Sequence, residues 1–140
     1  MSEENKAVVR RAFEEVANKG DMTTVDEIIA LEYVRHDLAG GPDTAGPDGV
    51  KRLITGLRTA FPDLQTTIED IFSDGEKVVV RFSAAGTQAA PFQGISPTGK
   101  RVTWAGINIY RVANGQIQET WQLADGLGLL RQLGAVPGGR

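Results

Sequence analysis

The sequence contains no cysteine and a single histidine, His36, among its 140 residues. Disulfides, thiolate nucleophiles and zinc–thiolate centres are therefore excluded, and one histidine cannot build a His-rich metal site. No apolar run approaches the ~20 residues that a membrane-spanning helix needs. Met1 is followed by the acidic segment Ser2-Glu3-Glu4 rather than by an apolar signal segment. We therefore expect a cytoplasmic protein with no membrane partner.

Neither positive nor negative side chains predominate in the sequence. The chain has 15 Lys and Arg against 18 Asp and Glu, a formal net charge of −3, and no local cluster of basic residues. A nucleic-acid partner is therefore not expected. The apolar share of 41% and the charged share of 24% are typical of a soluble globular domain of this length. We expect residues 1–140 to form a single domain, with 135–140 as a loose tail.

The first half of the chain is predicted to be mainly helical. Residues 3–18 carry apolar side chains at helical spacing, and Gly20 is placed to end that helix. Asp21 favours the start of a second, short helix as its N-cap. A third helix is predicted between Pro47, which suits a first helical turn, and Pro62, which ends the run.

From residue 65 the apolar period changes to two, which indicates strands. Residues 66–72 and 77–88 flank Asp74-Gly75, and residues 102–112 and 116–125 flank Asn114-Gly115. Such dipeptides favour two-residue hairpin turns, because both central residues need a positive φ. Helices followed by an antiparallel meander predict an α+β fold, in which a curved sheet packs on the N-terminal helices and leaves a cone-shaped cavity.

The hairpin register defines a candidate binding face. If Ala113 pairs with Gln116 and the ladder is regular, Asn108 lies opposite Trp121 and Trp104 lies opposite Asp125. This register holds only if no β-bulge interrupts the pair. The predicted cavity face then carries six residues of the hairpin: Trp104, Asn108, Tyr110, Trp121, Leu123 and Asp125.

Three residues on or near this face are candidates for catalysis. Asp125 beside an indole in an apolar cavity would lose hydration and so become a better base; alternatively, it only caps a final helix over residues 127–133. Asn108 could stabilise an enolate oxygen through its amide, or could be a buried amide satisfied by a neighbour. His36 could transfer a proton or donate to substrate, although a lone histidine is more often structural.

The substrate-binding candidates are the polar wall residues Tyr33 and Gln88 and the aromatic residues Phe82, Trp104, Tyr110 and Trp121. The aromatic side chains are interpreted either as core residues or as ligand contacts. The opposite face of the hairpin, which includes Ile107 and Ile109, is too apolar for a fully solvated surface. It predicts a homodimer that forms through the sheet.

Several stretches of the chain match motifs of one family. They are residues 33–37, 61–64, 86–87, 91–94, 97–100, 106–111, 114–117, 119–121 and 125–127. On these motifs the sequence resembles, from about residue 5 to 134, the SnoaL-like polyketide cyclases, a branch of the NTF2-like α+β cone fold. The resemblance implies a hydrophobic small-molecule ligand and no metal or cofactor.

The resemblance also implies a mechanism. In the family's cyclases an aspartate four residues after the tryptophan of the last strand, here Asp125, is the general acid/base. It takes an acidic proton from a polyketide ester, and the enolate closes a ring by intramolecular aldol addition. This chain has Gln88 and Asn108 where family members often have histidine and aspartate. Two alternatives therefore stay open: a proton-transfer isomerase like ketosteroid isomerase, and a non-catalytic small-molecule binding protein.

Overall fold

The computed structural model describes residues 2–135. Its helices are α1 (Ser2–Arg11), the π-helix η1 (Ala12–Ala17), α2 (Met22–Ile28), α3 (Gly46–Ala60) and α4 (Gly126–Gln132). Its strands are β1 (Ile29–Asp37), β2 (Thr44–Ala45), β3 (Gln65–Asp74), β4 (Lys77–Thr87), β5 (Arg101–Ala113) and β6 (Gln116–Ala124). The predicted tail lies outside the described residues except for its first residue, 135.

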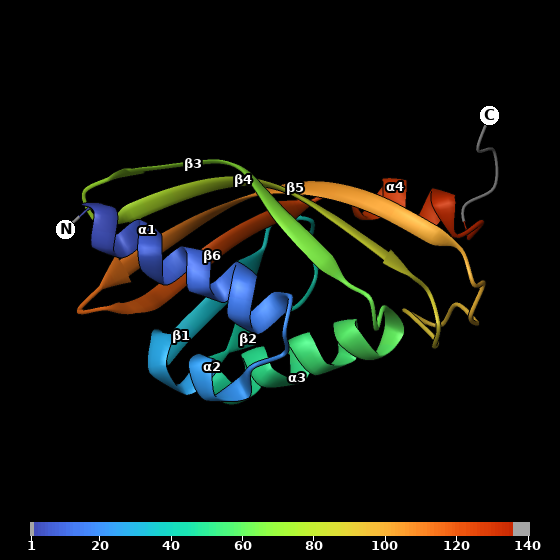
Figure 1. Ribbon diagram of the computed structural model, residues 1–140, viewed down its shortest axis with the longest axis horizontal. Helices are drawn as coiled ribbons and strands as arrows, with labels where there is room; N and C mark the ends of the chain where they lie inside the picture. Colours follow the sequence, from blue (N-terminus) through green and yellow to red (C-terminus); the bar gives the residue numbers. More distant parts are fainter. Residues whose placement is uncertain (1, 136–140) are drawn as a thin grey trace.

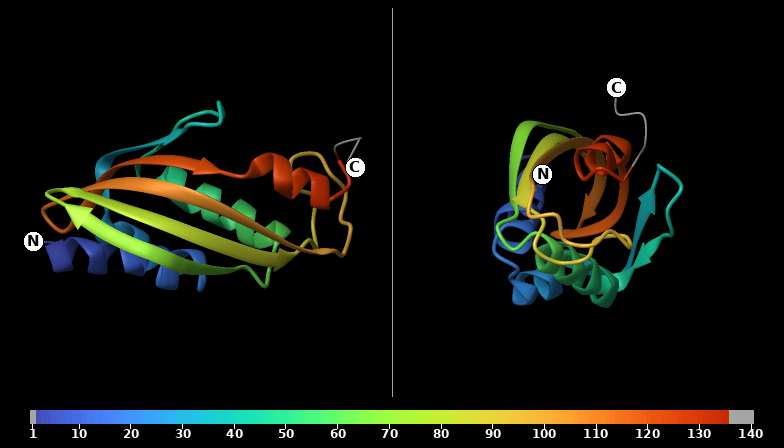
Figure 2. Two further views of the ribbon diagram at one scale, coloured as in Figure 1. Left: turned by 90° about the horizontal axis from the view of Figure 1, so that it is seen from above. Right: turned by 90° about the vertical axis from the view of Figure 1, so that its right-hand side faces the viewer.

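The strands form one sheet of six strands in the order β2-β1-β6-β5-β4-β3. Only the β1–β6 pair is parallel among the described strands. The sheet curves over α1, α2 and α3, and α4 lies at the end of the molecule away from the N-terminus (Figures 1 and 2). This is the predicted α+β cone. No helix within residues 2–135 is long and apolar enough to span a membrane.

The helix boundaries follow the predicted signals. Gly20 has a φ of +69° after the first helical segment, and Asp21 Oδ1 accepts a hydrogen bond of 3.2 Å from Thr24 N at the start of α2. Pro47 lies in the first turn of α3. The predicted helix over residues 3–18 is helical, but its second half is a π-helix.

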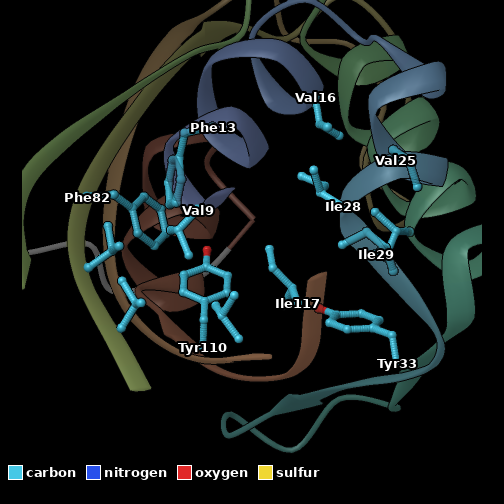
Figure 3. Packing of buried hydrophobic residues seen from close by; sticks show 14 residues of the cluster. Val9, Phe13, Val16, Val25, Ile28, Ile29, Tyr33, Phe82, Tyr110 and Ile117 are labelled. Carbon is cyan, nitrogen blue, oxygen red and sulfur yellow. The ribbon is translucent and has the colours of Figure 1, made fainter. Parts of the chain in front are cut away.

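The core lies between the helices and the concave face of the sheet. Phe13 of η1 packs against Phe82 and Tyr110, with ring centroids 5.6 and 6.3 Å away. Figure 3 shows these rings together with Val9, while Ile28 of α2 lies on the other side of the interior. The alternating residues of β4 that face inward are almost fully buried, as the period of two predicts.

The first hairpin has a different loop from the predicted one. Asp74 pairs with Lys77, so that the loop is Gly75-Glu76 rather than Asp74-Gly75. Ile71 therefore lies opposite Val80 instead of Val78. Because this shift is two residues, residues 70–74 stay on their predicted faces. A bulge at Glu69 then pairs Ile68 with Phe82, so that Ile68 and Ile71 both pack against the core.

The second hairpin contains a β-bulge, and the predicted register is wrong beyond it. Asn114 and Gly115 form the turn with φ values of +56° and +73°, and Ala113 pairs with Gln116 as predicted. Gln118 is then an extra residue on β6, because the next pair is formed by Arg111 and Glu119. A shift of one residue reverses the faces of β6. Its inward side chains are therefore Thr120, Gln122 and Ala124, whereas Trp121 and Leu123 lie on the convex face.

Candidate functional site

A cavity of about 880 Å³ lies between the concave face of the sheet and the helices. Most of its wall is apolar, which suits a hydrophobic ligand of small-molecule size. The wall includes Phe13 of η1, Leu57 of α3, Phe82 of β4, Trp104 of β5 and Leu130 of α4. The cavity thus draws on elements from both ends of the chain.

A row of polar side chains crosses this apolar wall on three neighbouring strands. Asn108 of β5 lies opposite Gln122 of β6, and Gln122 lies beside Asp37 of β1. Arg35 of β1 donates a hydrogen bond of 2.6 Å from Nε to Gln122 Oε1. All four residues line the cavity. We call Asn108, Gln122, Arg35 and Asp37 the polar row.

The amide of Asn108 is held by Tyr110 and leaves one atom without a partner. Its Nδ2 donates a hydrogen bond of 2.7 Å to Tyr110 Oη. Its Oδ1 is buried and has no hydrogen-bond partner in the described part of the chain. Burial raises the pKa of Tyr110 well above its ordinary range, so that the hydroxyl keeps its proton at neutral pH. The pair therefore offers an acceptor, Asn108 Oδ1, and a donor, the Tyr110 hydroxyl.

Tyr33 is a second buried phenol in the cavity wall. Its hydroxyl donates a hydrogen bond of 2.9 Å to Thr120 Oγ1. Burial raises the pKa of Tyr33, and the bond to Thr120 partly opposes that effect. Tyr33, Phe82, Trp104, Asn108 and Tyr110 thus all line the cavity; their contacts with substrate remain proposals.

Asp125 is the N-cap of α4. Its Oδ1 accepts a hydrogen bond of 2.8 Å from Gly128 N, and its backbone N–H donates to the Ala105 carbonyl at 2.9 Å. It therefore lies beside Ala105, and the predicted pairing with Trp104 is wrong. The carboxylate is exposed, so the desolvation expected from that pairing does not occur. Asp125 itself does not line the cavity, although its neighbours on both sides do.

His36 and Trp121 lie together on the convex face, away from the cavity. Their rings are stacked with centroids 5.7 Å apart, and His36 Nε2 is 2.6 Å from Glu119 Oε2. This hydrogen bond, with a smaller contribution from Arg111, lowers the pKa of Glu119. The prediction that Trp121 belongs to the cavity face is wrong because of the bulge. The position of His36 gives no support to its candidate role in proton transfer.

Gln88 holds a loop rather than lining the cavity. The side chain is fully buried, and its Nε2 donates to the carbonyls of Ala90 and Ile95 at 3.2 and 3.0 Å. Its Oε1 accepts from the backbone N and the hydroxyl of Thr98 at 3.0 and 2.8 Å. Gln88 therefore fixes the loop between β4 and β5, part of which lines the cavity.

Six polar residues that line the cavity were not among the sequence-based candidates: Arg35, Asp37, Arg52, Thr66, Gln93 and Gln122. Arg35 and Asp37 alternate with Tyr33 along one strand, so that a period of two was sufficient to place them on the same face. Gln122 had no such signal, because its inward direction depends on the bulge. Within residues 2–135 no group of three or more His, Asp or Glu side chains is arranged to hold a metal ion.

The comparisons with known proteins agree with this architecture. The family model for SnoaL-like polyketide cyclase matches residues 7–133. The chain is 31% identical over 130 residues to the aklanonic acid methyl ester cyclase DnrD of Streptomyces peucetius, an alignment that covers 91% of this chain and 88% of the relative.

Solved structures show the same fold. A protein described as a SnoaL-like polyketide cyclase, from Jannaschia sp. CCS1, superposes with a TM-score of 0.87 at 25% identity, covering 97% of this chain and 95% of that one. IdmH of Streptomyces antibioticus, described as a polyketide cyclase, superposes with a TM-score of 0.80 at 32% identity, covering 93% and 98%. The predicted NTF2-like α+β cone is thereby confirmed.

Proposed function

The chain belongs to the SnoaL-like polyketide cyclase family, and we propose that it catalyses a cofactor-independent intramolecular aldol cyclisation of a polyketide methyl ester. The cavity supports this proposal best, because it combines apolar walls with a row of polar side chains on β1, β5 and β6. A polyketide ester has the matching character, a hydrophobic skeleton with oxygen atoms along one edge. The name of the relative DnrD suggests an aklanonic acid methyl ester as the first substrate to assay.

The reaction needs one proton-transfer group and a dry cavity. A carboxylate removes an acidic C–H proton next to the ester, and the enolate carbon attacks a ketone carbon of the same molecule. One C–C bond forms, the ketone π bond breaks, and the alkoxide takes the proton back, so that no atom is lost. Apolar walls favour this step because they exclude water and orient the two reacting carbons.

We assign the proton transfer to Asp125. It lies four residues after Trp121, where the family's cyclases have their general acid/base, and it follows Ala124, which lines the cavity. Within residues 2–135 the capping hydrogen bond of α4 uses only the Oδ1 atom of Asp125. Asp37 is the competing candidate, because it is the one carboxylate among the described residues that lines the cavity.

Matched amide variants distinguish these two carboxylates. Asn is as good an N-cap as Asp, so Asp125→Asn should keep α4 folded. We expect Asp125→Asn to lose ring closure, measured by mass-resolved chromatography of product, while Asp37→Asn keeps most of it. Loss only in Asp37→Asn would move the base to β1, and full activity in both variants would contradict carboxylate catalysis.

A non-catalytic binding protein is the second candidate, and the exposed position of Asp125 favours it. Such a protein would bind the ester at micromolar concentration and return it unchanged. Binding measured by tryptophan fluorescence, together with no product after prolonged incubation, would select this alternative. An isomerase would instead move a double bond without ring closure, which the same chromatography detects.

We also propose that a second copy of the chain covers the convex face. The exposed fractions of Phe72, Ile107, Ile109 and Leu123 there are 58, 51, 38 and 52%. Two ion pairs also link neighbouring strands there, Arg81–Asp70 and Arg111–Glu119. They offer charges of both signs to a symmetry-related copy. Light scattering should give the molar mass of a dimer for the wild-type protein and that of a monomer for Leu123→Glu. A monomeric wild-type protein at micromolar concentration would contradict this proposal.

A further inference from the structure

We propose that the polar row is an oxyanion subsite, in which Arg35 holds the ionised oxygen of an enolised 1,3-dicarbonyl ligand and Asn108 accepts a hydrogen bond from a hydroxyl of the same ligand. The inference rests on the proposed function, because it names the form in which the substrate binds. It does not depend on which carboxylate moves the proton.

Arg35 is a positive charge in the cavity wall with no carboxylate partner. Its Nε is used by Gln122, but it forms no ion pair with any acidic side chain of residues 2–135. Asp37, two residues along the same strand, instead accepts a hydrogen bond from Ala39 N. A half-buried cation without an oppositely charged partner is costly, and an anionic ligand oxygen would reduce that cost.

Gln122 fixes the direction of the guanidinium. Because its Oε1 accepts the Arg35 Nε–H at 2.6 Å, the planar guanidinium is held against β6 and its terminal N–H groups remain for a ligand. Gln122 Nε2 adds two further donors. A ligand oxygen bound between Arg35 and Gln122 would receive charge-assisted hydrogen bonds from the guanidinium and neutral ones from the amide.

Asn108 and Tyr110 supply the remaining polar atoms. Burial raises the pKa of both Tyr33 and Tyr110, and the positive charge of Arg35 acts against that effect. In Figure 3 the hydroxyl of Tyr110 points into the interior between Phe13 and Ile117. The buried Asn108 Oδ1 can only accept, which selects a ligand with a hydroxyl donor beside its ionised oxygen.

The charged residues lining the cavity in residues 2–135 are Arg35, Asp37 and Arg52. Arg52 is exposed on α3 and carries the same charge as Arg35. It therefore provides a matched control, since removing its charge changes the general field at the cavity without touching the polar row.

The subsite can be tested by binding alone, without turnover. The probe is 2-hydroxy-1,4-naphthoquinone, an enolised 1,3-dicarbonyl equivalent that is coloured and anionic at neutral pH. Its anion has no hydroxyl, so it tests the contact with Arg35. Its methyl ether is a neutral ligand with the same ring system and one added methyl group. We expect wild-type protein to bind the anion at least about tenfold more tightly than the ether, the range of one charge-assisted hydrogen bond.

Three variants decide the assignment. Arg35→Gln should abolish the preference for the anion while keeping affinity for the ether, and Arg35→Lys should retain part of it. Arg52→Gln should reduce the preference far less than Arg35→Gln does. The absorbance of the bound probe gives a second readout: its apparent pKa should fall on binding to wild type and not on binding to Arg35→Gln.

Equal affinity of wild type for the two probes would overturn the proposal, as would an equal loss in Arg35→Gln and Arg52→Gln. A folded Arg35→Gln variant that keeps the anion preference would also overturn it. Failure of the protein to cyclise any ester would leave the probe result intact and would refute only the proposed reaction.

Discussion

Replacing Gln88 by leucine should loosen the loop over residues 88–100 and lower the stability of the whole protein. The fully buried amide makes four hydrogen bonds, with Ala90, Ile95 and Thr98, at 2.8–3.2 Å. Each is worth about 1 kcal/mol net, and the loop partners can regain water, so we expect a loss of about 3 kcal/mol. For a domain of this size the midpoint of thermal unfolding should fall by roughly 10 °C.

The assay is chemical and thermal denaturation followed by circular dichroism. Gln65→Leu is the matched control, because Gln65 is exposed and its side chain makes one hydrogen bond of 3.5 Å, with Thr66 O. We expect that control to change stability by less than about 0.5 kcal/mol. If Gln88→Leu costs no more than the control, the loop is not held by this amide and our account of Gln88 is wrong.

Further predictions concern the convex face and the packing of the cavity floor. Glu119→Gln should destabilise the protein at neutral pH but not in acid: the hydrogen bond with His36 lowers the pKa of Glu119 below its ordinary 4.5, so its contribution is lost as pH falls through the lowered value. An equal effect at both pH values in urea titrations would contradict this. Gly106→Ala should cost about 1–3 kcal/mol in urea unfolding, since overpacking strains a filled site, and the new Cβ would lie 2.6 Å from Phe82 Cζ. Unchanged stability would show that the ring moves freely. Phe61→Ala, which empties a fully buried position, should cost about 3–5 kcal/mol by the same assay; a loss below about 1 kcal/mol would refute its place in the core.

The helices and the two hairpins could be predicted because their signals are local, whereas the parallel pairing of β1 with β6 has no local signal. Asp21, Pro47 and the positive-φ turn at Asn114-Gly115 act within a few residues of themselves, and each does what its type favours. The first hairpin shows the limit of such signals. Asp74-Gly75 marks the turn correctly but not which two residues form its loop.

The candidate site was predicted well on β5 and poorly on β6, and one bulged residue explains the difference. Asn108 and Tyr110 follow the alternation of their own strand, so that their inward direction did not depend on a partner strand. The faces of Trp121 and Gln122 depend on how β6 pairs with β5 after Gln118. The residue types around Gln118 do not distinguish a bulge from a regular ladder. Because of this one extra residue, the side chain that lines the cavity is the amide of Gln122 and not the indole of Trp121.

Gln88 illustrates a different limit. A polar residue at the end of a strand next to a predicted pocket is compatible with ligand contact or with loop anchoring. Which of the two occurs depends on the path of residues 88–100. That path brings the carbonyls of Ala90 and Ile95 within hydrogen-bond distance of the Gln88 amide. No local pattern specifies that path, because it is set by contacts between segments distant in the sequence, such as that of Phe92 with Phe61, the C-cap of α3.

We propose that a carboxylate at the end of β6 removes a proton from a ligand held in the cavity. Proton NMR of the polyketide ester in deuterated water measures that step directly, as the rate at which its acidic C–H exchanges, whether or not a ring closes. The account predicts exchange well above the uncatalysed rate with wild-type protein and the uncatalysed rate with folded Asp125→Asn. Exchange in the Asp125→Asn variant as fast as in wild type would contradict it.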